Sequence, residues 1–221
     1  MTHNLFTPKF ENLPDVIPVF PLPGAILMPG TQLPLNIFEP RYLRMLNDVL
    51  SNDRIIGIVQ PDSRSRDDEV VCNTGCAGRI TSFNETDDGR FIVLLSGLCR
   101  FDLVAETTDG TDYRTFRVDW SRFQSDYDLE QSLDGLSTSR DALLKWVREF
   151  GSTRNAEVDF DSLGKLNDLQ VVNVLICGLG FEPPSVQGLI ESVSLTDRAD
   201  LLSGLLRIAS MNSSDPGHHT H

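Results

Sequence analysis

The sequence predicts an α+β protein whose strands and helices occupy different halves of the chain. Residues 1–120 contain short apolar runs separated by turn residues, which is typical of about six β-strands. Residues 121–221 contain apolar residues at helical spacing, which indicates about four helices. Because the two kinds of element are segregated, we expect a β subdomain over 1–120 and a helical subdomain over 121–221.

The first ordered segment, IPVFPLPGAILMPGTQLPLNIFEPRY at residues 17–42, is apolar and rich in proline. Proline has no backbone N–H, so it suits strand ends, edge strands and turns better than central strands. We therefore expect short strands at 17–22 and 32–38, with Pro-Gly turns at 23–24 and 29–30 between them.

One helix and four strands are expected to complete the first half. Pro40 suits the first position of a helix, where its missing N–H costs nothing. The apolar stripe of this helix is Tyr42, Leu43, Met45, Leu46, Val49 and Leu50. Strands are expected at 54–60, 76–84, 90–106 and 113–120, with a hairpin turn at 86–89.

Helices in the second half are expected at 139–150, 166–177, 184–193 and 197–210. Gly151 and Gly178 are expected to end the first two of these helices. Thr196 is the expected N-cap of the last one. The composition of the tail from residue 212 predicts disorder.

The net charge of −13 is shared by both halves of the chain. Such a chain is repelled by phosphate backbones and anionic lipids, so we expect no nucleic-acid or membrane partner. No apolar run is long enough to span a bilayer, and the first residues do not resemble a secretory signal. We therefore expect a cytoplasmic protein whose cysteines are reduced: Cys72, Cys76, Cys99 and Cys177.

The residue types that carry most enzyme chemistry are missing from the interior of the sequence. Histidine occurs only near the termini, at 3, 218, 219 and 221, so we expect no catalytic or metal-binding histidine within the fold. Neither GxxxxGK[ST] nor GxGxxG occurs, so no nucleotide cofactor is expected. We predict no catalytic residue, no metal and no cofactor.

Two chemical alternatives remain open at this point. Cys76 or Cys99 could act as a nucleophile if it were exposed and had a lowered pKa, although both fall on expected strands. Neighbouring carboxylates at 67–69 and 87–88 could form an acid–base pair, although solvated turns explain them better.

Three separated motifs resemble the N-terminal, substrate-binding domain of the Lon protease family. The first is the proline-rich segment at 17–42, and its IFEPRY ending is similar to stand-alone Lon-domain proteins of bacteria. The second is TGCAGRI at 74–80 followed by DDGRFIVLLSGLCRF at 87–101. The third is LIESVSLTDRADLLSGLLR at 189–207. The resemblance therefore covers about residues 16–209.

This resemblance implies a twisted β-pseudobarrel of PUA-like type followed by a helical bundle. In the Lon family this region recognises protein substrates for separate ATPase and protease domains. The resemblance therefore implies an ATP-independent, non-catalytic module that binds unfolded polypeptide or a protein partner. A small enzyme with carboxylate or cysteine chemistry, and a PUA-like RNA-binding module, are the alternatives. The sequence predicts no particular oligomeric state.

Two groups of residues are candidates for contact with a partner. Phe38, Arg41 and Tyr42 lie at the corner between the second strand and the first helix. The alternative is that Phe38 and Tyr42 pack into the barrel while Arg41 pairs with a carboxylate. The second group lies between the two Pro-Gly turns and would form an apolar patch if exposed: Ile26, Leu27 and Met28.

Overall fold

The computed structural model describes residues 7–65, 69–108, 110–127, 139–154 and 158–212. Disorder was expected from residue 212, but residue 212 is helical, and residues 213–221 lie outside this part of the chain. None of the described helices is both long and apolar enough to cross a lipid bilayer.

The chain forms two compact units. The barrel unit comprises Met1–Leu129 and Asn173–Glu191, and the helical unit comprises Glu130–Val172 and Ser192–His221. The barrel unit thus includes helical segments from the second half of the chain. That the chain divides after residue 120 stays a prediction.

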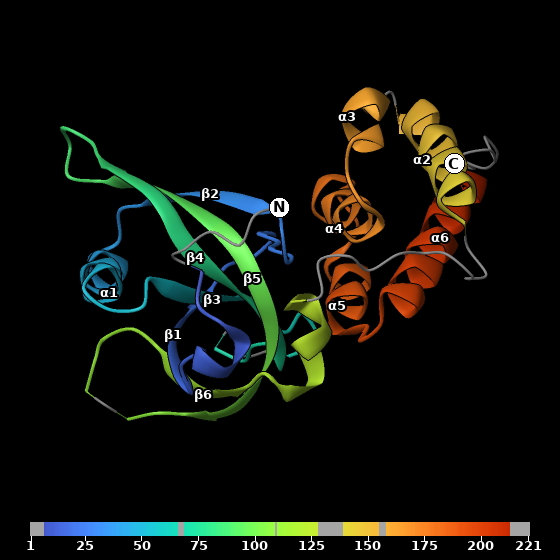
Figure 1. Ribbon diagram of the computed structural model, residues 1–221. Helices are drawn as coiled ribbons and strands as arrows, with labels where there is room; N and C mark the ends of the chain where they lie inside the picture. The colour runs from blue at the N-terminus through green and yellow to red at the C-terminus, as the bar shows by residue number, and fades with distance from the viewer. Residues whose placement is uncertain (1–6, 66–68, 109, 128–138, 155–157, 213–221) are drawn as a thin grey trace, which may run out of the picture. The chain divides into compact units, whose positions relative to one another are not determined.

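Six strands and one helix make up most of the barrel unit (Figure 1). They are β1 Val16–Pro21, β2 Gln32–Ile37, α1 Pro40–Leu50, β3 Ile55–Val59, β4 Thr74–Glu85, β5 Phe91–Glu106 and β6 Thr115–Asp119. The strand order is β2-β5-β4-β3-β1-β6, and β6 also pairs with β5. Five of the described strands therefore close into a ring, while β2 has β5 as its one partner among them and lies outside the ring. These elements confirm the predicted α+β class.

Strand β5 is long enough to pair with β2 at one end and with β6 at the other. Residues 91–96 pair with β2, and residues 102–106 pair with β6 after a shift of register against β4 near Gly97. Gly97 lies where the loop after β1 crosses β5, because its N–H donates to the Thr31 carbonyl and its carbonyl accepts from Gly30. The register shift and the loop crossing thus coincide at Gly97.

Two apolar clusters fill the barrel unit. One joins the buried face of α1 to strands β2, β4 and β5, through residues such as Met45, Leu46, Ile37, Ile80 and Leu95. The other lies inside the ring and includes Ile17, Val19, Phe101, Phe116 and Phe123. Helix α1 is thus held against the strands by the stripe that its sequence predicted.

The described residues of the second half form five α-helices. They are α2 Arg140–Arg154, α3 Phe160–Gly164, α4 Asp168–Gly178, α5 Pro183–Glu191 and α6 Leu195–Asn212. In the helical unit α2 packs against α6, with Leu143, Val147 and Leu202 buried. The Arg140 guanidinium bonds the carbonyls of Leu163 and Leu166.

Two expected helix limits are wrong, and local contacts explain both. Helix α2 continues past Gly151, which is buried, so this glycine is not a stop signal. Helix α6 is capped by Ser194 rather than Thr196, since the Ser194 hydroxyl accepts a 3.0 Å bond from the N–H of Asp197. The limit at Gly178 is confirmed.

Candidate functional site

The corner after β2 exposes one of its two aromatic candidates and buries the other. Phe38 is 61% exposed. Tyr42 is buried, and its ring packs against Phe20 with the ring centroids 4.0 Å apart. Arg41 is exposed and forms an ion pair with Glu39 at 3.1 Å. Tyr42 is therefore wrong as a contact residue, whereas Phe38 and Arg41 stay candidates.

The apolar segment between the two Pro-Gly turns packs inward instead of forming a surface patch. Leu27 and Met28 are buried, and Ile26 is half-buried. The Thr31 hydroxyl donates to the Met28 carbonyl and accepts from the Met28 N–H, which folds the segment back on itself. Leu27 reaches the strands beside Gly78, where a Cβ would lie 2.7 Å from its side chain. Leu27 and Met28 are therefore wrong as contact residues, because the loop fills the space above the sheet.

Strand β2 has one open edge. The Thr31 carbonyl accepts from the N–H of Gly97 in β5. Because backbone groups alternate along an antiparallel strand, those of 33, 35 and 37 face β5 and those of 32, 34 and 36 face away. Pro34 lies on the open side, where its missing N–H breaks no bond to β5. The open edge thus presents the N–H groups of Gln32 and Asn36.

A shallow hollow of about 400 Å³ lies where β2 meets the β4–β5 hairpin. Its apolar wall is Ile92, which is 52% exposed and lies opposite Asn36 in the sheet. Its polar rim includes the hairpin residues Asp88 and Arg90, which form an ion pair at 2.7 Å. Phe38 follows Asn36 on the same face of the strand, since side chains alternate along β-strands.

We call this set the β2-edge surface: Gln32, Pro34, Asn36, Phe38 and Ile92. It combines backbone groups that have no strand partner among the described residues with exposed apolar side chains. The three β2 residues in it are exposed, and β2 is the terminal strand in the order of the described sheet. Such an edge can accept an added strand.

The buried thiols do not have the properties of a nucleophile. Cys72, Cys76, Cys99 and Cys177 are free. Burial raises the pKa of all four thiols, most strongly for Cys76 and Cys99. Reactive cysteines need the opposite shift. Cys76 and Cys99 thus lack the exposure and the lowered pKa that the cysteine alternative requires.

The carboxylates proposed for acid–base chemistry are only partly described. Asp67 and Asp68 lie outside the described residues, and Glu69 is exposed. Hydrogen bonding by Thr86, with a smaller contribution from Arg90, lowers the pKa of Asp88. An ionised, exposed turn carboxylate does not suit general acid catalysis at neutral pH. Among described residues, no three His, Cys, Asp or Glu side chains gather where they could hold a metal.

The thiols give a first testable prediction. Iodoacetamide at neutral pH should alkylate Cys76 and Cys99 at least about a hundredfold more slowly in the folded protein than in urea, because reaction needs an exposed thiolate. Folding also raises the pKa of both thiols, so the protonated thiols contribute to the free energy of unfolding. This contribution is fully present below the unfolded pKa of about 8.5 and is lost as the pH rises above it. Mass spectrometry of timed samples measures the rates. Rapid native labelling of either residue would contradict the account.

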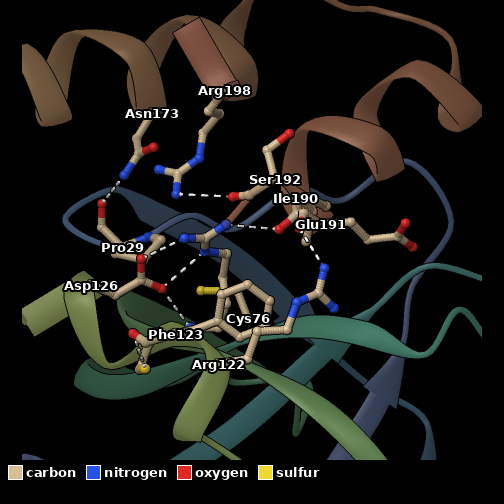
Figure 2. A network of polar contacts seen from close by, with 12 residues as sticks. Pro29, Cys76, Arg122, Phe123, Asp126, Asn173, Ile190, Glu191, Ser192 and Arg198 are labelled. Carbon is tan, nitrogen blue, oxygen red and sulfur yellow. Dashed lines mark hydrogen bonds and ion pairs between the residues drawn. The ribbon is translucent and has the colours of Figure 1, made fainter. Parts of the chain in front are cut away.

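A buried arginine attaches helix α5 to the barrel. Arg100 in β5 is fully buried, and its guanidinium donates to both carboxylate oxygens of Asp126, at 2.9 and 2.7 Å. It also donates to the Ile190 carbonyl in α5 at 2.9 Å, while Arg122 donates to the carbonyl of Glu191 (Figure 2). The charges of Arg100 and Asp126 neutralise each other, so we interpret this ion pair as structural.

Comparison with known proteins decides the family. Residues 16–207 match the family model described as the ATP-dependent protease La (LON) substrate-binding domain. The chain belongs to this family.

Relatives of this Lon-type domain are much longer proteins. The chain is 26% identical over 201 residues to the Lon protease of Parabacteroides distasonis, covering 88% of this chain and 24% of that protein. It is 23% identical over 195 residues to the Lon protease of Flavobacterium johnsoniae, covering 86% of this chain and 23% of that protein. The chain thus spans about a quarter of the length of these relatives.

Two solved structures share the Lon-type fold. A Lon N-terminal domain protein from Xanthomonas campestris aligns with a TM-score of 0.61 and 20% identity, over 86% of this chain and 97% of that one. The N-terminal domain of Mycobacterium avium complex Lon protease aligns with a TM-score of 0.58 and 13% identity, over 91% of this chain and 100% of that one.

Part of this Lon-type surface was not predicted from the sequence. Ile92 is exposed between half-buried Phe91 and buried Val93, in a strand whose sequence is almost continuously apolar. Its exposure depends on β2 lying outside the ring, which no local pattern specifies. The one available signal was the Asp-Gly turn just before it, which predicted a hairpin but not its exposed side.

Proposed function

We propose that this Lon-type domain binds extended, unfolded polypeptide segments at the β2-edge surface and catalyses no reaction of its own. The observation that carries the proposal is the open edge of β2, flanked by exposed Phe38 and Ile92. An added strand would gain backbone hydrogen bonds that do not depend on its sequence, and its apolar side chains would contact these two residues.

The chemistry of the edge favours unfolded chains over folded partners. Strands of folded proteins already have their backbone groups paired, whereas an unfolded segment has free N–H and C=O groups. Pro34 interrupts the row of donors, which limits pairing between copies of this chain. Binding is therefore weak for each segment and tolerant of sequence. A folded protein partner that uses the same edge is the alternative.

We also propose that the protein is cytoplasmic and binds neither nucleic acid nor anionic membranes. The free cysteines support a reducing, cytoplasmic location. The net charge of −13 supports the exclusion of nucleic acid and anionic membranes. The family description supports a role in presenting protein substrates to a protease.

The test measures polypeptide affinity in variants of the surface. Phe38→Ser combined with Ile92→Ser should weaken binding of fluorescein-labelled, reduced and carbamidomethylated lactalbumin at least about tenfold, equivalent to about 1.4 kcal/mol. Each change removes exposed apolar area from the binding face. Fluorescence anisotropy at physiological ionic strength gives the dissociation constants.

The matched control is Val104→Ser. Val104 lies at the other end of β5 and, like Ile92, is 52% exposed. Its replacement should leave affinity within about twofold of the wild type. Equal losses in Val104→Ser and in the double variant, or no loss in the double variant, would exclude the β2-edge surface as the binding site.

A further inference from the structure

A second hollow in the barrel unit, of about 650 Å³, is lined by cations. Lys9, Arg54 and Arg79 are among its lining residues, together with Asn12 and Asn52. It shares no residue with the β2-edge surface, so what it binds does not depend on the proposed function.

The backbone holds the two arginines close together. Arg54 has a φ of 60°, in the left-handed region that residues other than glycine and asparagine rarely adopt. Its N–H donates to the Val49 carbonyl in α1, and its carbonyl accepts from Ile80 in β4. Arg79 is next to Ile80 and lies opposite Ile55 in the sheet. A strained position of this kind is kept only where the surroundings fix it, and such positions concentrate at binding sites.

Three of the residues that line this hollow are cationic and one, Asp53, is anionic. Partial burial and the nearby charge of Arg54 lower the pKa of Arg79. Among described residues, neither arginine nor Lys9 forms an ion pair with a carboxylate, although eight other arginines do. Asp53 also lines the hollow but pairs with none of the three. In a chain with a net charge of −13, a cluster of unpaired cations favours an anionic ligand.

We propose that this hollow binds a small oxyanion with at least two negative charges, such as a phosphoryl group or a di- or tricarboxylate. Guanidinium groups bind such oxygens through paired N–H donors, and two of them can bind one ligand from two sides. Lys9 supplies a third positive charge. An occupied site would also offset the repulsion between Arg54 and Arg79.

The test titrates the whole protein with pyrophosphate and, separately, with citrate, each against sodium chloride of equal ionic strength. Isothermal calorimetry should show saturable binding of at least one of them. Arg79→Gln should weaken that binding at least about tenfold, since one bidentate contact is lost. Tighter binding of pyrophosphate would identify a phosphoryl ligand, and tighter binding of citrate a polycarboxylate. No saturable binding of either would overturn the proposal.

Two variants separate a binding role from a structural one. Arg117→Gln is the matched control, because Arg117 is exposed on β6 and forms no ion pair among the described residues. It should leave the affinity unchanged. Arg54→Asn should also weaken binding about tenfold, while its melting temperature should be no lower than that of the wild type, because asparagine tolerates the left-handed conformation. Wild-type affinity in both Arg54→Asn and Arg79→Gln, or equal losses in Arg117→Gln, would contradict the site.

Discussion

Replacing Asp126 by alanine is expected to lower the free energy of unfolding by about 3–5 kcal/mol, because the buried Arg100 charge would then have no counterion. The exposed fractions of the two side chains are 0% and 1%, so water cannot replace the lost carboxylate. The Ile190 carbonyl would remain as one acceptor for Arg100. The free energy of unfolding of the barrel unit is measured by urea denaturation, with Trp120 fluorescence as the signal in a Trp146→Phe background.

Two controls show whether burial causes this loss. Glu106 forms a bidentate ion pair with Arg114 at 2.7 Å for both bonds, but both side chains are partly exposed. Glu106→Ala should therefore cost only about 0–1 kcal/mol. Replacing both buried partners, with Arg100→Met and Asp126→Leu, should recover much of the stability lost in Asp126→Ala. A loss in Asp126→Ala no greater than that in Glu106→Ala would contradict the structural role of the pair.

Gly97→Ala is expected to destabilise the barrel unit by about 1–3 kcal/mol, as overpacking does in other cores. A Cβ at this position would collide with the Met28 carbonyl, which is backbone and cannot rotate away. The loop before β2 would have to move off β5, and Leu27 would lose its packing. The same Trp120 measurement reports the change.

Gly178→Ala is the matched control within the barrel unit. Gly178 ends α4, and a Cβ there would meet nothing within 4 Å. Its replacement should be neutral or stabilising by up to about 1 kcal/mol, since alanine favours helix and restricts the unfolded chain. Equal destabilisation by both variants would mean that the contact at Met28 does not explain the effect.

The elements of the barrel unit were readable from the sequence because their signals are local. Proline positions and the Asp-Gly turn predicted β1, β2 and the β4–β5 hairpin to within about two residues. The apolar stripe of α1 already included Tyr42, so its burial followed from helical spacing. Phe38 continues the exposed alternation of 32, 34 and 36, whereas Tyr42 lies on the buried face of α1.

The remaining features depend on contacts between residues far apart in the sequence. Arg100 binds Asp126 and Ile190, which lie 26 and 90 residues further along the chain. Arg54 and Arg79 come together only because β3 pairs with β4. Leu27 and Met28 looked like an exposed patch because turn residues flank them, but the glycines at 78 and 97 leave space for their loop on the sheet. None of these arrangements has a signature within one segment.

The most direct test of polypeptide binding at β2 is amide hydrogen exchange in the isotopically labelled protein, with and without saturating carbamidomethylated lactalbumin. Strand addition predicts that exchange of the Gln32 and Asn36 amides slows at least about tenfold on binding, because these donors face the open edge. The Leu33 and Leu35 amides, which face β5, should change little. Saturable binding with unchanged exchange at Gln32 and Asn36 would contradict the account.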